Sequence, residues 1–135
     1  MAVQLSVAAR NARLDAIETA AGASAILKIR TGAQPATCAT ADSGTVLATL
    51  DLPADYLAAA GSGTKAKSGT WEDASADAAG TAGHFRIYAS DGTTCHMQGT
   101  VTATSGGGDL ELNNVVLAAG QTVTITSFTL TDGNA

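Results

Sequence analysis

The side chains of this chain that could carry out chemistry are few, and their spacing matches no common site. The 135 residues contain two cysteines and two histidines, Cys38, Cys95, His84 and His96. A structural zinc site takes four ligands, and Cys38 has no second cysteine at C-x2-C spacing. We therefore predict no metal site and no cofactor. The sequence leaves open whether Cys38 and Cys95 are buried free thiols or pair as a disulfide.

Nucleophilic and acid–base catalysis are disfavoured on similar grounds. Cys95 and His96 are neighbours on a predicted strand, so their side chains point to opposite faces and form no Cys–His pair. No serine lies in a G-x-S-x-G turn. The acidic residues Glu72, Asp73 and Asp77 do not follow the spacing of an EF-hand loop. We predict no catalytic residue and no enzyme, and a small hydrolase that depends on a histidine is the least favoured alternative.

Charge and hydropathy argue against two classes of partner. The net charge is −5, and the seven basic residues are spread along the chain, so they form no cationic patch for phosphates. No apolar run has the length needed to cross a bilayer. The first fifteen residues lack the basic start and apolar centre of a signal peptide. We therefore expect no nucleic-acid partner, no membrane association and no export by such a peptide.

The composition predicts a thin core. Alanine accounts for much of the 45% hydrophobic content, and only 4% of the residues are aromatic. Burial of apolar area contributes about 25 cal/mol per Å2, so a chain with few large side chains gains less stability from its own core. Such a protein has more reason to use a partner surface.

Hydrophobic periodicity predicts one helix followed by about seven strands. Residues 6–21 place apolar side chains at helical spacing, and Gly22 is a natural end for this helix. Residues 25–31 and 45–52 predict strands. Inward parity changes at Thr126–Ser127 within a later strand, which indicates a bulge or a bend.

These elements together predict the fold class. We expect a mainly β protein, an antiparallel β-sandwich of jelly-roll or Ig-like type, preceded by one N-terminal α-helix. The helix and its connection, residues 1–24, form a predicted helical arm. Residues 25–135 form the predicted β-sandwich domain.

Residues 83–104 predict a β-hairpin with a three-residue loop, Ser90–Asp91–Gly92. This loop places Ile87 opposite Cys95 and keeps apolar side chains on one face, with Gly92 in the left-handed bulge position. In this register Cys95 points inward. The outward face then carries His84, Arg86, Tyr88 and His96.

Charges on the predicted helix are unfavourable for a helix that stands alone. Arg10 and Arg13 lie toward its N-terminus and Asp15 and Glu18 toward its C-terminus, which opposes the macrodipole. No opposite charges lie at i,i+3 or i,i+4 spacing. The helix therefore either packs on its own domain or acts as an arm that docks on another subunit. The second interpretation predicts a partner-binding surface comprising Val7, Arg10, Arg13, Leu14 and Ile17.

A resemblance to a known family runs through nearly the whole chain. It is carried by AVQLSVAARNARLDAIETAAG, LKIRTGAQPA, GSGTKAKSGTWEDASADAAGTAGHFRIYASDGTTCHMQGTVTAT and QTVTITSFTLTDGNA. In these stretches the chain resembles small proteins of tailed bacteriophages and prophages that are encoded among virion structural genes. The resemblance implies a virion role and supplies no functional residues.

The function implied by this resemblance is that of a non-enzymatic virion structural protein, assembled in the host cytoplasm. We expect a capsid decoration (cement) or head spike protein that binds the major capsid protein or other virion proteins as an oligomer. A homotrimer suits the threefold and quasi-threefold positions of a capsid. The alternative is a neck, tail or fibre component with a host-surface binding role.

Overall fold

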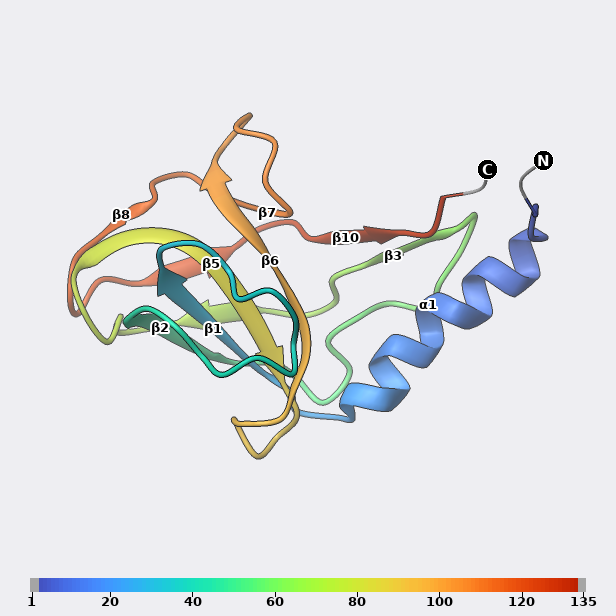
Figure 1. Cartoon of the computed structure of the whole chain (residues 1–135), viewed down its shortest axis with the longest axis horizontal. Helices are drawn as coiled ribbons and strands as arrows, with labels where there is room; N and C mark the ends of the chain where they lie inside the picture. The colour runs from blue at the N-terminus through green and yellow to red at the C-terminus, as the bar shows by residue number, and fades with distance from the viewer. Residues whose placement is uncertain (1–2, 134–135) are drawn as a thin grey trace.

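The computed structural model describes residues 3–133, and it confirms the predicted fold class. Curled, mostly antiparallel sheets form a β-sandwich-like body that follows one N-terminal helix (Figure 1). The elements are α1 (Val7–Ala21), β1 (Ile26–Thr31), β2 (Val46–Asp51), β3 (Thr64–Ala66), β4 (Trp71–Asp73), β5 (Gly80–Tyr88), β6 (Cys95–Ala103), β7 (Leu110–Leu112), β8 (Val116–Leu117), β9 (Val123–Ile125) and β10 (Thr129–Thr131).

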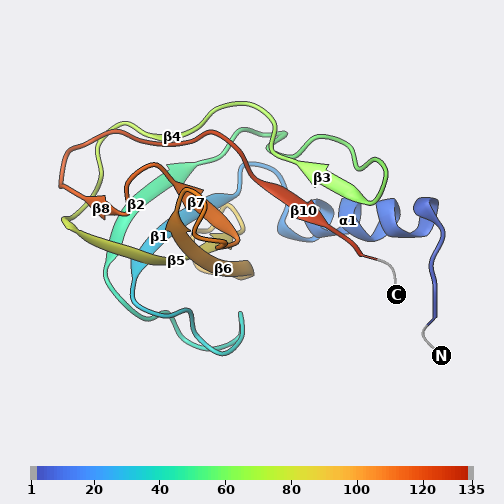
Figure 2. The ribbon, with the colours of Figure 1, turned by 90° about the horizontal axis from the view of Figure 1, so that it is seen from above.

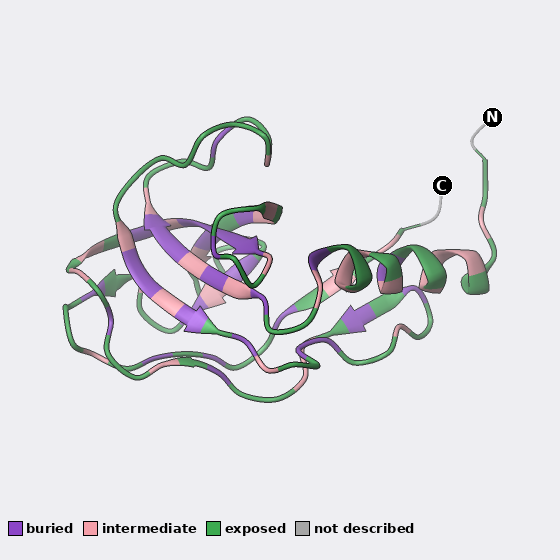
Figure 3. Cartoon of the chain, turned by 90° about the horizontal axis from the view of Figure 1, so that it is seen from below, coloured by how far each residue is buried: buried purple, intermediate pink, exposed green. Residues whose placement is uncertain are grey.

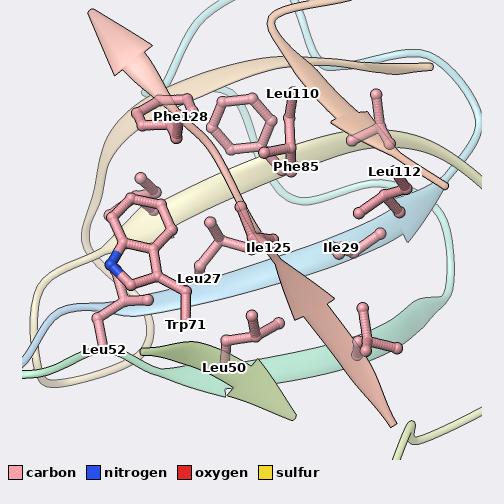
Figure 4. Close-up of a cluster of buried hydrophobic side chains, with 14 of the residues drawn as sticks. Leu27, Ile29, Leu50, Leu52, Trp71, Phe85, Leu110, Leu112, Ile125 and Phe128 are labelled. Carbon is pink, nitrogen blue, oxygen red and sulfur yellow. The ribbon is translucent and has the colours of Figure 1, made fainter. Parts of the chain in front are cut away.

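Three sheets build the molecule. The largest has the strand order β2-β1-β5-β6-β7, and β8 pairs with the start of β5. All its pairs are antiparallel except β6–β7, which is parallel. The β4–β9 pair crosses over the large sheet (Figure 4). The β3–β10 pair extends from the body beside α1 (Figure 2).

The core lies between the large sheet and the β4–β9 pair, and three aromatic rings occupy its centre (Figure 4). Trp71 is fully buried, and its ring centroid lies 5.4 Å from that of Phe128. Phe85 meets Phe128 edge-on at 5.7 Å, a favourable aromatic geometry. Trp71 and Phe85 are among the largest fully buried side chains of the described residues.

A break between β9 and β10 coincides with the parity change predicted at Thr126–Ser127. The strand before the break pairs with β4, and the strand after it pairs with β3. Phe128 lies between the two strands and turns into the core. The chain thus leaves the body at this point and continues into the projecting end.

The turn between β5 and β6 differs from the predicted three-residue loop. The strands end at Tyr88 and resume at Cys95. The Asp91 carboxylate accepts the backbone N–H groups of Thr93 and Thr94 at 2.8 and 2.9 Å, which holds a wider turn. The prediction was wrong because apolar alternation does not encode this side-chain cap. Gly92 does adopt the left-handed conformation, with φ 70°.

A β-bulge between Ile87 and Tyr88 accompanies the wider turn and changes the face on which Cys95 lies. Ile87 pairs with Met97, and Tyr88 pairs with Cys95. Because one extra residue reverses the faces of a strand, Cys95 shares the outer face of the sheet with Tyr88. The prediction that Cys95 points inward is therefore wrong.

The outer face of β5 is covered rather than solvated. Residues 32–45, which we call the flap, cross this face in front of the sheet (teal in Figure 1). The flap begins close to β5 because Gly83 has no side chain, and a Cβ there would collide with the carbonyl oxygen of Gly32. Three side chains that were predicted to face outward are consequently at most 1% exposed, namely His84, Arg86 and Tyr88.

Asp42 joins the flap to the sheet. Its Oδ1 accepts from Arg86 Nη1 at 2.6 Å and from the Tyr88 hydroxyl at 2.8 Å, and its Oδ2 accepts from Arg30 Nη2 at 2.8 Å. Burial alone would raise the pKa of Asp42, but the hydrogen bonds from Tyr88 and Arg86 and the nearby guanidinium charges hold that pKa below its usual range. One carboxylate therefore pairs with two buried arginines.

Replacing Asp42 with asparagine tests this link. Asp42→Asn keeps the shape and removes the charge between two buried guanidinium groups, so we expect the free energy of unfolding to fall by about 3 kcal/mol at pH 7. Because folding lowers the pKa of Asp42, its contribution is present above the unfolded-state value of about 3.9 and declines as the pH falls through the folded-state value. The difference in free energy of unfolding between the wild type and Asp42→Asn, measured by urea denaturation, should therefore be smaller at pH 3 than at pH 7.

Asp51→Asn is the matched control, because Asp51 is exposed at the end of β2. We expect it to change the free energy of unfolding by no more than about 0.5 kcal/mol. Equal stability of Asp42→Asn and Asp51→Asn at pH 7 would contradict the proposed role of Asp42.

Candidate functional site

Helix α1 lies at one end of the molecule, alongside the β3–β10 pair, and together they form what we call the projecting end (Figures 1 and 2). The Ser6 side chain caps the helix by accepting the Ala9 N–H at 3.1 Å. Gly22 ends it with φ 82°. The predicted helix and its end at Gly22 are thus confirmed.

The two arginines of the predicted surface have partners within the chain. Arg10 Nη1 donates to the Asp132 carbonyl at 3.1 Å, and Arg13 Nε lies 3.2 Å from the Asp132 carboxylate. The Arg13 side chain is still 62% exposed, so this ion pair adds little stability by itself. The helix therefore packs on its own domain, and these charges do not require another subunit to be neutralised.

The carboxylates of the helix also bind their own chain. Asp15 accepts from Lys65 Nζ at 2.7 Å and from the Ala60 N–H at 3.0 Å. Glu18 lies 3.1 Å from Lys65 Nζ and accepts the Leu57 N–H at 3.3 Å. The charges of Asp15 and Glu18 oppose the helix dipole, but in the folded protein they form contacts with other parts of the chain.

Lys65 is the central group of this cluster, since it is only 2% exposed. Burial by itself would lower the pKa of Lys65, but hydrogen bonds to Asp15 and Glu18 outweigh burial and raise it. The Lys65 hydrogen bond is also the main reason that the pKa of Asp15 is lowered. Each charge therefore favours the ionised form of its partner, and the cluster fixes α1 to β3.

The apolar residues of the predicted surface fall on different sides of α1. Leu14 is 3% exposed and packs inward, whereas Val7 is 48% exposed. Ile17 is half-buried and lines a groove of about 430 Å3 between α1 and the end of β10. Figure 3 shows the helix with mostly exposed and intermediate residues, in contrast to the buried strands of the body. Val7 and Ile17 are thus the apolar residues of this set that a partner could reach.

Sequence reasoning missed Lys65 and Asp132, whose side chains pair with the charges of the helix. The spacing of the helix charges was the available signal. The four charged side chains of the helix have no opposite charge at i+3 or i+4, which indicates that their partners lie elsewhere in the fold. The sequence does not show where those partners lie, since Lys65 and Asp132 are distant along the chain.

The histidines and the acidic loop do not converge on a reactive centre. His84 is fully buried, and its Nδ1 lies 2.9 Å from the Gly32 carbonyl oxygen, whereas His96 is exposed. Asp73 accepts the Thr49 N–H at 2.9 Å, so this acidic residue serves to join β4 to β2. Within residues 3–133, no three His, Cys, Asp or Glu side chains are grouped as a metal site would need. Over the same residues, the helix is too short and too polar to span a bilayer.

A second hollow lies on the body, away from α1. It has a volume of about 280 Å3 and is formed by the segments around β7, β8 and β9. Its rim is rich in amide and hydroxyl side chains, which can donate and accept hydrogen bonds. These side chains are Asn113, Asn114, Gln121, Thr122, Thr124 and Thr126.

Comparisons of the chain with protein-family models, curated proteins and solved structures find no match.

Lys65→Met tests the attachment of α1. Methionine retains the apolar stem and removes the charge, which leaves Asp15 and Glu18 without their common partner. We expect the free energy of unfolding to fall by about 2 kcal/mol, because one partner of a buried ion pair is lost. Hydrogen exchange of the α1 amides should become faster than in the wild type, and this increase should exceed any increase for the β1 and β5 amides.

Lys67→Met is the control, because Lys67 lies two residues further on and its Nζ donates to the Gly69 carbonyl in an exposed position. We expect it to cost less than about 1 kcal/mol and to leave α1 exchange unchanged. If Lys65→Met leaves α1 as protected as in the wild type, the charge cluster is not what holds the helix.

Proposed function

We propose that this protein is a non-enzymatic virion structural protein of a tailed bacteriophage or prophage. Its specific role would be capsid decoration or a head spike, in which many copies bind the capsid surface as oligomers. The resemblance of the chain to small virion proteins suggests this class. The proposal for how it binds rests on the projecting end.

The observation that carries the binding mode is that the projecting end is both fixed and accessible. Lys65 and Asp132 hold α1 against the β3–β10 pair, while Val7 and the groove beside Ile17 remain open. A surface that is already ordered loses less conformational entropy on docking than a flexible arm does. We therefore propose that this end contacts the capsid and that the β-sandwich-like body faces away from the capsid surface.

The proposed assembly needs only weak individual contacts. An oligomer presents several projecting ends together, and once one has bound, the others bind at high effective concentration. A homotrimer matches threefold positions in a capsid, and the major capsid protein is the proposed partner. In this arrangement Val7, Ile17 and the exposed part of Arg13 meet the partner, whereas Arg10 and Leu14 position the helix.

A second candidate function is a neck, tail or fibre component that binds the host surface. The observation that favours it is the hollow around β7, β8 and β9, whose lining includes amide and hydroxyl side chains that can bind hydroxyl-rich ligands. The two candidates use different regions of the molecule, so variants can separate them.

Two exposed valines allow a matched test. Val7 is 48% exposed on α1, and Val116 is 59% exposed on β8, which lies away from α1 at the other end of the molecule (Figure 1). Aspartate at either position should leave the fold intact, because neither side chain is in the core. We expect Val7→Asp to lower incorporation into particles at least 10-fold, which corresponds to about 1.4 kcal/mol, and Val116→Asp to leave it unchanged.

Quantitative mass spectrometry of purified particles measures this incorporation, and circular dichroism of the purified variants checks their folding. Normal incorporation of Val7→Asp would refute docking through the projecting end. Loss with Val116→Asp alone would favour attachment through the opposite end and thus the second candidate.

A further inference from the structure

The two cysteines of this protein lie on the same side of the large sheet. The bulge between Ile87 and Tyr88 pairs Cys95 with Tyr88 and turns its side chain to the outer face. That face is the one that the flap covers, and Cys38 lies in the middle of the flap. Residues distant in sequence are therefore brought together by the register of one hairpin.

Hydrogen bonds on both sides of Cys38 hold this part of the flap over β5 and β6. Arg86 Nη2 donates to the carbonyl oxygens of Thr37 and Thr40 at 2.9 and 3.0 Å. Gln98 Nε2 donates to the Pro35 carbonyl at 2.6 Å. The backbone around Cys38 is therefore anchored to β6, which begins at Cys95, and to its neighbour β5.

The two thiols are near each other. Cys38 and Cys95 are both free and half-buried, and Cys38 lies close enough to Cys95 to affect its ionisation. The Cys95 sulfur also lies 3.4 Å from the Met97 carbonyl oxygen. Burial, followed by the interaction with Cys38, raises the pKa of Cys95 to about 12, so this thiol keeps its proton at neutral pH.

We propose that Cys38 and Cys95 form an intramolecular disulfide under oxidising conditions and that this bond fastens the flap to β6. The reduced protein already brings Cys38 and Cys95 to the same face of the sheet, with the flap on both sides of Cys38 anchored by Arg86 and Gln98. The disulfide then adds a covalent attachment to those that the Asp42 carboxylate and the hydrogen bonds from Arg86 and Gln98 already provide. The inference concerns the purified chain and does not depend on the proposed virion role.

The reaction balances with a small-molecule disulfide as the oxidant. The Cys38 thiolate attacks one sulfur of oxidised glutathione, which breaks the glutathione S–S bond and releases one glutathione thiolate. Cys95 then loses its proton to solvent, and its thiolate attacks the Cys38 sulfur of the mixed disulfide, which breaks that bond and releases the second glutathione. The two protein thiols lose two protons and two electrons, and two molecules of reduced glutathione carry them away.

Oxidation should stabilise the protein chiefly by restricting the unfolded chain. The bond closes a loop of roughly 60 residues, for which the chain-entropy model predicts a stabilisation that corresponds to a Tm increase of about 15 °C in a protein of this size. The disulfide should also make Asp42→Asn lower the Tm by less, because the flap stays covalently attached to β6. The Tm loss caused by Asp42→Asn should therefore be smaller in the oxidised than in the reduced protein.

The experiment equilibrates the full chain with excess oxidised glutathione or with reductant. Intact-mass analysis, thiol alkylation and Tm are measured on both samples. We expect the oxidised protein to be monomeric, to lose about 2 Da and both alkylatable thiols, and to return to its original Tm on reduction. Cys38→Ala, Cys95→Ala and the double variant should show no oxidation-dependent rise in Tm.

Three results would overturn the inference, and all can be read from the wild type alone. They are two thiols that stay alkylatable in excess oxidant, stable addition of glutathione to either cysteine, and a disulfide between two chains. A wild type that forms the internal bond with no change in Tm, and with an unchanged effect of Asp42→Asn, would refute the fastening of the flap.

Discussion

The pairing of buried cations with carboxylates, most of them partly exposed, is the interaction on which the rest of this structure depends. Large apolar side chains are scarce, and Trp71, Phe85 and Phe128 already fill the centre of the core. The two segments outside that core, α1 and the flap, are attached through ionic clusters centred on Lys65 and Asp42. Ion pairs of this kind are costly to desolvate, but removing one partner lowers the free energy of unfolding strongly because the other charge is left uncompensated. They also demand a specific geometry, which suits segments that must be held in one place.

The helix, the fold class and several strands could be predicted from the sequence because their signals are local. Ser6 and Gly22 mark the ends of α1, and the parity change at Thr126–Ser127 marks the break between β9 and β10. The hairpin failed because its register depends on an Asp91 cap and a bulge, which apolar alternation does not report. The error was consequential, since a shift of one residue placed Cys95 on the wrong face.

The candidate site shows the same division between local and tertiary information. Helical spacing identified Val7, Arg10, Arg13, Leu14 and Ile17 as one set, but it could not tell which side of the helix the protein itself covers. Contacts with Asp132 and Lys65 settle this, because they bind Arg10, Arg13, Asp15 and Glu18 to the same chain. What remains accessible on α1 includes the exposed Val7 and the half-buried Ile17 beside the groove, together with the exposed part of Arg13. The function that we propose depends on this surface and not on charges awaiting a partner.

The central claim is that the charge clusters hold a preformed end that docks on a capsid while the β-sandwich-like body faces outward. A cryo-electron-microscopy map of the particle that carries this protein tests it most directly. The account predicts body density at threefold or quasi-threefold positions of the capsid, with α1 and the β3–β10 pair against the major capsid protein. Density confined to the neck or tail, or contact through the β8 end, would contradict it.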